Sequence, residues 1–109
     1  MLGEAAASFW QGMLRLRQHR PTEAAALFER VLSVTRELGE VAGQAQALRG
    51  LGLAHRDVGR IEEARRRLRE AHALVASVGV SLLGEYIRRD LEELGHRDEV
   101  GGGSLAAVE

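Results

Sequence analysis

The residues of this chain that could do chemistry are four histidines, five serines and a run of arginines, and their spacing supports no catalytic site. No two histidines stand four residues apart and there is no cysteine, so the spacings typical of zinc sites are missing. The serines lie outside any nucleophile motif, and Gly101–Gly103 neither follow a strand nor precede a helix, as a phosphate-binding loop would. We therefore predict no enzyme activity, no catalytic residue, no metal and no cofactor.

The segment Arg65–Arg69 holds four arginines around one leucine and could suggest contact with nucleic acid. On a helix, however, Leu68 would face the core, and Glu62 and Glu63 each stand four residues before an arginine, the favoured spacing for an ion pair. The expected pairs are Glu62–Arg66 and Glu63–Arg67, which leave Arg65, Arg69 and His72 as an unpaired basic stripe. We do not expect this stripe to bind nucleic acid.

Composition indicates one soluble domain without a strong electrostatic preference for a partner. The 109 residues carry a formal net charge of -1, and all fifteen basic residues are arginine, which we attribute to codon bias in a GC-rich genome. The first residues do not form a secretory leader, and no apolar run approaches the roughly 18 residues of a membrane span. We expect a cytoplasmic protein that does not enter membranes.

The elements that must position any functional residue follow from a repeat of forty residues. The positions that recur are Gly3/Gly43, Ala5/Ala45, Ala7/Ala47, Gly12/Gly52, Glu23/Glu63, Ala24/Ala64 and Gly39/Gly79. A fixed period of this length is typical of a repeat array, in which each unit buries its apolar face against its neighbours. Arrays of this kind act mainly by binding other molecules.

Glycines at the joints and apolar residues at helical spacing predict five helices. They should cover about residues 4–18, 21–38, 41–58, 61–78 and 81–94. The faces expected to point inward carry Ala24, Phe28, Val31, Thr35 and Leu38; Ala45, Leu48, Leu51, Gly52 and His55; Ile61, Ala64, Leu68, Ala71, Val75 and Val78; and Leu83, Tyr86, Ile87, Leu91 and Leu94. We assign residues 1–95 to a helical repeat domain and 96–109 to a flexible tail, because the tail lacks any amphipathic period.

Joints of two or three residues force consecutive helices to be antiparallel. Gly12 and Gly52 stand in mid-helix, where glycine costs about 1 kcal/mol relative to alanine. We explain both by a close approach of the partner helix, at Ala24 and Ala64 respectively. The predicted fold is all-α: antiparallel helix pairs stacked as a short right-handed superhelix.

The second forty-residue unit resembles the tetratricopeptide repeat over its whole length. From Ala45 it carries the residues of that pattern, with His55 at the aromatic place: Leu48, Leu51-Gly52, His55, Gly59, Ala64, Leu68 and Ala71. The first unit keeps Gly12, Ala24 and Phe28, but has Ser8 and Gln11 where large apolar residues are usual. The long period looks like the extended form found in bacterial signalling and transcriptional regulators and in some polarity adaptors.

The fifth helix has Leu91 in the leucine place of the pattern but Glu92 in the glycine place. That departure suits a terminal helix that no further helix approaches closely. The resemblance covers about residues 4–95 and implies two repeats followed by a C-terminal capping helix.

The resemblance also implies where a partner would bind, because the first helix of each pair lines a concave groove in this family. Carried over by position, the partner-binding candidates are Trp10, Met13, Arg17, Arg49, Leu53, Arg56, Tyr86 and Arg89. An apolar floor beside several arginines would suit an extended or helical peptide with acidic side chains. The alternative is that these arginines form only a solvated face. The Lys and Asn residues that let some members clamp a carboxyl terminus are missing, which argues against binding of chaperone tails.

Phe9 and Trp10 fall where the first repeat departs most from the pattern, and two interpretations remain open for them. They either pack against the second helix as core, or form an exposed aromatic patch that marks self-association or a partner. Short arrays often bury their ends by dimerising, which favours a homodimer.

We accordingly expect a protein-interaction scaffold in a bacterial regulatory or assembly system, whose groove captures a peptide or helix of a protein partner. The alternative is a homo-oligomerisation module whose main contact is with itself.

Overall fold

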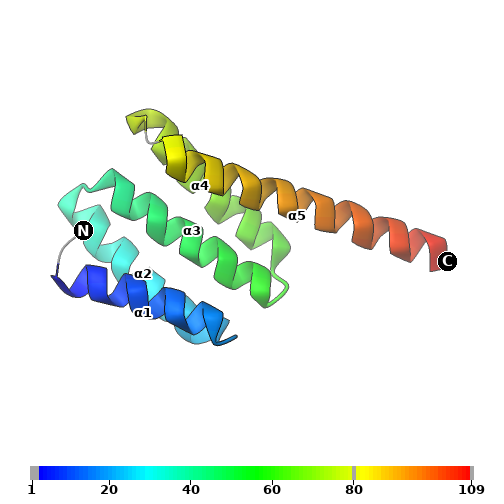
Figure 1. Ribbon diagram of the computed structural model, residues 1–109, viewed down its shortest axis with the longest axis horizontal. Coiled ribbons are helices and arrows are strands. Elements are labelled where there is room, and N and C mark those ends of the chain that lie inside the picture. The colour runs from blue at the N-terminus through cyan, green and yellow to red at the C-terminus, as the bar shows by residue number, and fades with distance from the viewer. Residues whose placement is uncertain (1–2, 80, 109) are drawn as a thin grey trace.

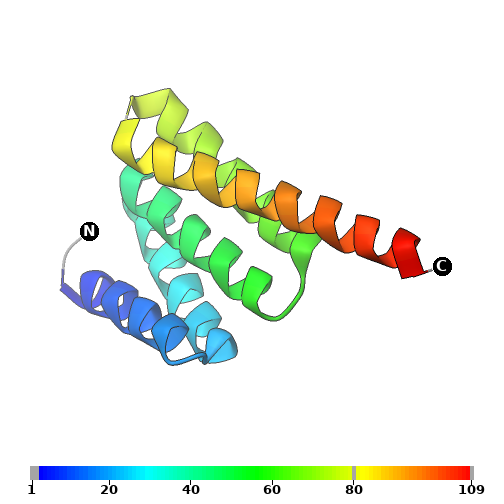
Figure 2. The same ribbon diagram turned by 45° about the vertical axis from the view of Figure 1, so that its right-hand side comes forward.

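The computed structural model describes the backbone of residues 3–79 and 81–108, and the side chains of residues 3–79 and 82–96. The helices are α1 (Gly3–Arg17), α2 (Pro21–Leu38), α3 (Val41–Asp57), α4 (Ile61–Val78) and α5 (Ser81–Val108). In Figures 1 and 2, α1, α3 and α5 run side by side in one direction, while α2 and α4 return behind them. The predicted all-α fold of stacked antiparallel helix pairs is confirmed, and each helix packs on the next along the chain.

The joints repeat every twenty residues with one backbone geometry. His19, Gly39, Gly59 and Gly79 all adopt a left-handed conformation, with φ between 60° and 82°. At the first three joints the following N–H donates to a carbonyl five residues earlier, as in the Schellman motif: Arg20 to Arg15, Glu40 to Thr35 and Arg60 to His55. Helix ends and helix reversals are therefore set by residues that accept a positive φ, as the glycine pattern predicts. His19 is the exception in residue type.

Phe28 joins the two repeats, because its fully buried ring lies between α1 and α3. A Cβ placed on Gly12 would lie 2.8 Å from the Phe28 ring, and one placed on Gly50 would lie 2.6 Å from it. In the second repeat, a Cβ on Gly52 would lie 2.7 Å from Leu68 and 3.3 Å from the backbone oxygen of Ala64. The expected close approach at Ala64 is confirmed, whereas Gly12 makes room for the Phe28 ring instead of Ala24.

The core is continuous through α2, α3 and α4 and takes in Ile87 and Leu94 of α5. Three of the predicted inward residues are wrong, because Leu38, Val78 and Tyr86 are exposed. Tyr86 lies on α5, and Leu38 and Val78 lie at the ends of α2 and α4. Leu38 and Val78 each stand directly before the glycine that ends the helix, at the edge of the packed layer, and Leu32 is buried in α2 instead.

The predicted end of the last helix at Leu94 is also wrong, because α5 continues as helix to Val108 and extends beyond the ends of α3 and α4 (Figures 1 and 2). No residue between Leu94 and Val108 imposes a left-handed turn, and a helix already formed gains one hydrogen bond for each residue added. Continuation costs only the low helix propensity of Gly95 and Gly101–Gly103. The boundary between a repeat domain and a flexible tail at residue 96 stays a prediction.

Candidate partner-binding site

The concave layer formed by α1, α3 and α5 holds a small apolar cavity of about 220 Å³, which we call the concave pocket. It is lined by Phe9, Trp10, Met13, Gln46, Arg49, Gly50, Leu53, Leu83 and Tyr86. Five of the eight predicted partner-binding residues thus come together: Trp10, Met13, Arg49, Leu53 and Tyr86. The parallel course of the three helices brings residues about forty positions apart to the same level, so the repeat itself assembles the pocket.

Arg49 does not present a free guanidinium to the pocket. Its Nε donates to Asp90 Oδ2 at 2.5 Å and its Nη2 donates to Asp90 Oδ1 at 3.5 Å, across α3 and α5. The guanidinium carbon also lies 5.5 Å from the centre of the Tyr86 ring. Only 25% of the Arg49 side chain and 12% of the Asp90 side chain are exposed, so water screens this pair less than an ion pair on the open surface. A carboxylate of a partner would have to compete with Asp90 for Arg49.

The other three predicted binding residues lie outside the concave pocket. Arg56 is paired with the adjacent Asp57, its Nε 3.1 Å from Asp57 Oδ1, near Leu16 and the first joint. Arg17 and Arg89 are exposed, and neither forms an ion pair with another residue in the part of the chain whose side chains are described. These two arginines are the free cations among the predicted site residues.

The sequence leaves open whether the aromatic side chains of α1 are core residues or an exposed patch, and the structure gives a different answer for each of them. Phe9 is half-buried and packs edge-on against Phe28, with ring centres 5.8 Å apart. Trp10 also stands edge-on to Phe9, at 5.3 Å, but 67% of it is exposed. Phe9 therefore belongs to the core and lines the pocket floor, whereas Trp10 forms an exposed aromatic surface at the rim.

Sequence reasoning missed Gly50 and Leu83 as pocket residues, and also missed the Arg49–Asp90 pair. Gly50 brings bare backbone to the pocket floor, and Leu83 is half-buried instead of lying deep in the core. The signal for the pair was its separation of 41 residues, close to one repeat, which places an arginine and a carboxylate on neighbouring parallel helices.

Three of the four arginines in the basic run of α4 are paired with glutamates, although not all with the expected partners, and the prediction that Arg65 is unpaired is wrong. Glu62 pairs with Arg65 and not with the predicted Arg66, while Glu63 pairs with both Arg66 and Arg67. Arg67 also reaches Glu29 of α2, at 3.5 Å. The steps of three and four residues are both available on a helix, which is why the sequence leaves the choice between them open.

His55 stands near this polar cluster and is half-buried, not fully in the core as predicted. Burial is the main cause that lowers its pKa below 6.5, and nearby Arg67 and Arg60 act in the same direction against Glu63 and Glu29. Burial therefore disfavours the protonated, charged form of the imidazole. This suits a side chain that stands at an aromatic position of the repeat pattern.

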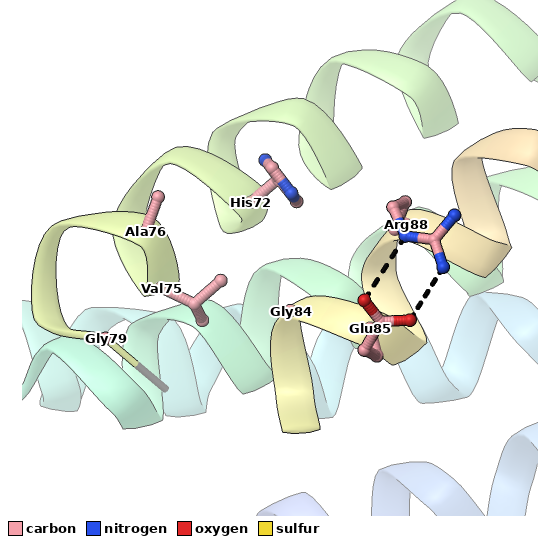
Figure 3. A pocket seen from close by; sticks show the side chains of 7 residues that line it. All are labelled: His72, Val75, Ala76, Gly79, Gly84, Glu85 and Arg88. Atoms are coloured by element: carbon pink, nitrogen blue, oxygen red, sulfur yellow. Dashed lines mark hydrogen bonds and ion pairs between the residues drawn. The ribbon is translucent and has the colours of Figure 1, made fainter. Parts of the chain in front are cut away.

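A second cleft, of about 270 Å³, lies on the outer side between α4 and α5. Val75 of α4 points toward Gly84 of α5, and Arg88 donates to both carboxylate oxygens of Glu85 along one wall (Figure 3). None of the predicted partner-binding residues lines this cleft.

Among the described residues, no group of three or more histidines and carboxylates is placed to hold a metal ion. No described helix is both long and apolar enough to cross a bilayer.

Taken together, the antiparallel helix pairs, the glycine-marked joints and the concave first-helix layer define a helical repeat domain. The family model described as tetratricopeptide repeat matches residues 4–77, more than half of the chain, and the chain belongs to the tetratricopeptide repeat family.

Among solved structures, the chain is similar to the TPR domain of Arabidopsis FLU, with a TM-score of 0.69 and 20% sequence identity. The match covers 95% of this chain and 96% of that one, and at this identity it shows the fold alone. No curated protein matches the chain. Tetratricopeptide repeats are generally protein–protein interaction modules.

Proposed function

We propose that this domain binds a segment of another protein at the concave pocket, anchored by one large apolar side chain. The observation that carries the proposal is the pocket itself, whose lining is mostly apolar and comes from the three first helices of the array. Its volume of about 220 Å³ lies below the roughly 300–1,000 Å³ typical of sites for small-molecule ligands. A cavity of this size suits a single side chain of a peptide or helix.

Acidic residues beside the anchor would complete the recognition. Because Arg49 is engaged by Asp90, the attraction for carboxylates would come from the exposed Arg17 and Arg89, which stand on α1 and α5, two of the helices that line the pocket. The partner is therefore a segment with a central apolar residue and flanking acidic residues. As in other non-enzymatic scaffolds of this family, we propose a role in assembly or regulation within a bacterial cytoplasm.

Selection of random peptides displayed on phage against the full chain would test this proposal. Enriched peptides should share a large apolar residue with an acidic neighbour. Titration calorimetry should then show affinity about tenfold or more weaker for Tyr86→Ala and for Arg89→Glu. Arg69→Glu is the matched control, because Arg69 is an exposed arginine of α4 away from the pocket. Peptides that bind all four proteins equally would show that the concave pocket is not the binding site.

A further inference from the structure

The uncovered face of α1, next to the pocket rim at Trp10, carries an apolar stripe of Ala7, Trp10 and Leu14, and each of these residues is exposed. Trp10 is 67% exposed and Leu14 is 49% exposed. Spacings of three and four residues place the three side chains on one face of the helix. Within the described part of the chain, no helix covers this stripe.

The forty-residue repeat shows what a stripe in this position does elsewhere in the molecule. The equivalent residues of α3 are Ala47, Gly50 and Ala54, and all three are buried. They lie on the side of α3 that faces the first repeat, since Gly50 packs on the Phe28 ring of α2. The α1 stripe is thus the surface on which this fold receives another helix, with larger apolar side chains in place of glycine and alanine.

The opposite end of the array does not offer a complementary surface. On α3, the residues that face α4 are Ala45, Leu48 and Gly52, all buried. The equivalent residues of α5 are Glu85, Arg88 and Glu92, all exposed and joined by ion pairs of Arg88 with both carboxylates. A helix stacked on α5 as α4 stacks on α3 would bury these charges, which is costly. Head-to-tail stacking of copies, α1 stripe against α5, is therefore disfavoured.

We infer that the α1 stripe is a homodimer interface, in which α1 of one copy packs antiparallel against α1 of a second copy about a two-fold axis. The charge distribution of α1 supports the antiparallel arrangement, since Glu4 stands in its first turn and the exposed Arg17 stands in its last turn. Arg15, also in the last turn, is engaged by Glu23 and Gln18. Antiparallel packing brings the acidic first turn of one helix beside the basic last turn of the other, and it also aligns the helix dipoles favourably. A two-fold interface uses the same patch on both copies and closes the assembly at two.

The dimer should be weak. The 15 residues of α1 span about 22 Å, so one helix pair reaches at most the low end of the roughly 1,200–2,000 Å² buried in stable interfaces. We expect a dissociation constant in the micromolar range.

Trp10 is the chain's only tryptophan and therefore reports directly on this interface. Sedimentation equilibrium and tryptophan fluorescence of the full chain, from about 1 µM to about 1 mM, should show monomer converting to dimer as the emission shifts to shorter wavelength. Leu14→Glu keeps the probe and leaves the concave pocket untouched, and it should weaken dimerisation about tenfold or more. Leu82→Glu is the matched control, because Leu82 is an exposed leucine on α5. It should dimerise as the parent chain does.

A cysteine-free chain also permits a test of geometry. Gln11 lies near the middle of the stripe and so close to the two-fold axis of the antiparallel pair. The Gln11→Cys variant should therefore form an intermolecular disulfide under mild oxidation. The control variant Ser33→Cys, at an exposed position on α2, should not. A chain that stays monomeric at all concentrations would overturn the inference. So would a dimer unaffected by Leu14→Glu, or assemblies that grow beyond two copies. The concave pocket could still bind its peptide in each of these cases, so the two proposals fail independently.

Discussion

The two repeats share one backbone plan but differ in how deeply their first helices are buried. Nine residues of α3 are buried, against three of α1, because α3 has a helix pair on both sides. At equivalent positions α3 has Gly50 and Ala54 where α1 has Trp10 and Leu14. On this face, small residues therefore mark the side of α3 that meets the first repeat, and large apolar residues mark the open side of α1.

The largest change in stability should come from Phe28→Ala, since the Phe28 ring touches both repeats. Loss of a fully buried phenylalanine costs about 3–5 kcal/mol. Leu68→Ala, at the equivalent position of the second repeat, should cost about 2–5 kcal/mol. Chemical denaturation would measure both. Hydrogen exchange should also show that Phe28→Ala raises exchange in α1 more than in α4, because the ring packs against α1 and α3; equal effects on α1 and α4 would mean that the two repeats open as one unit.

The next largest effect concerns two ion pairs of α5, one with α3 and one within α5 itself. Asp90→Ala should destabilise the fold by about 1.5–3 kcal/mol, because it leaves the half-buried Arg49 without its charged partner. Glu85→Ala removes one of the exposed carboxylates bound to Arg88 and should cost only about 0–1 kcal/mol. The denaturant midpoints of the two variants would measure the difference in their free energies of unfolding. If both cost the same, the half-buried Arg49–Asp90 pair stabilises the fold no more than an exposed pair does.

Replacing a helical glycine by alanine should either destabilise or stabilise the fold, depending on what packs against that glycine. Gly50→Ala forces a Cβ to within 2.6 Å of the Phe28 ring, so we expect a cost of about 1–3 kcal/mol. Gly95→Ala in α5 meets nothing within 4 Å and should instead gain up to about 1 kcal/mol from helix propensity. Thermal melts followed by circular dichroism would give both signs. A stabilised Gly50→Ala variant would contradict the close packing between Gly50 and Phe28.

The helix boundaries show how far the sequence predicts this fold. α2 and α4 begin and end where the sequence analysis places them, because Gly39 and Gly79 end each helix in a conformation that suits glycine. Gly95 directly follows Leu94, but it does not adopt the left-handed conformation, and the helix continues through it. The helix ends at Gly39 and Gly79 were therefore predictable, whereas the persistence of α5 through a glycine was not.

The candidate site likewise has a part that the sequence predicts and a part that it does not. Helical spacing and the repeat brought Trp10, Met13, Leu53 and Tyr86 to one pocket, since both depend on the backbone. The engagement of Arg49 by Asp90 depends on side-chain conformations across two helices, which no local pattern specifies. Exposure of Trp10 likewise depends on which helices lie beside α1.

The joints offer a smaller test, in which stability should increase. His19 has a φ of 60°, and its equivalent in the second repeat is Gly59, with a φ of 82°. A side chain in this conformation costs about 1 kcal/mol, so His19→Gly should stabilise the fold by about that amount. Gly59→Ala should destabilise it by a similar amount. Two variants with melting temperatures that move in the same direction would show that the two joints differ in more than residue type.

The smallest effect should be the pH dependence set by His55, which has no equivalent in the first repeat, where Arg15 stands at the matching position. Burial lowers the pKa of His55 in the folded chain, while the unfolded chain keeps a value near 6.5. The unfolded state therefore binds the proton more readily, and stability should fall as pH decreases from about 6.5 through the folded pKa. Arginine lowers the pKa of Glu63 and of Glu85, so loss of their pairs should appear only below about pH 4.5. Urea denaturation at a series of pH values would separate the two ranges. His55→Gln should remove the upper slope and leave the lower one, because glutamine does not titrate; an unchanged upper slope would assign it to another group.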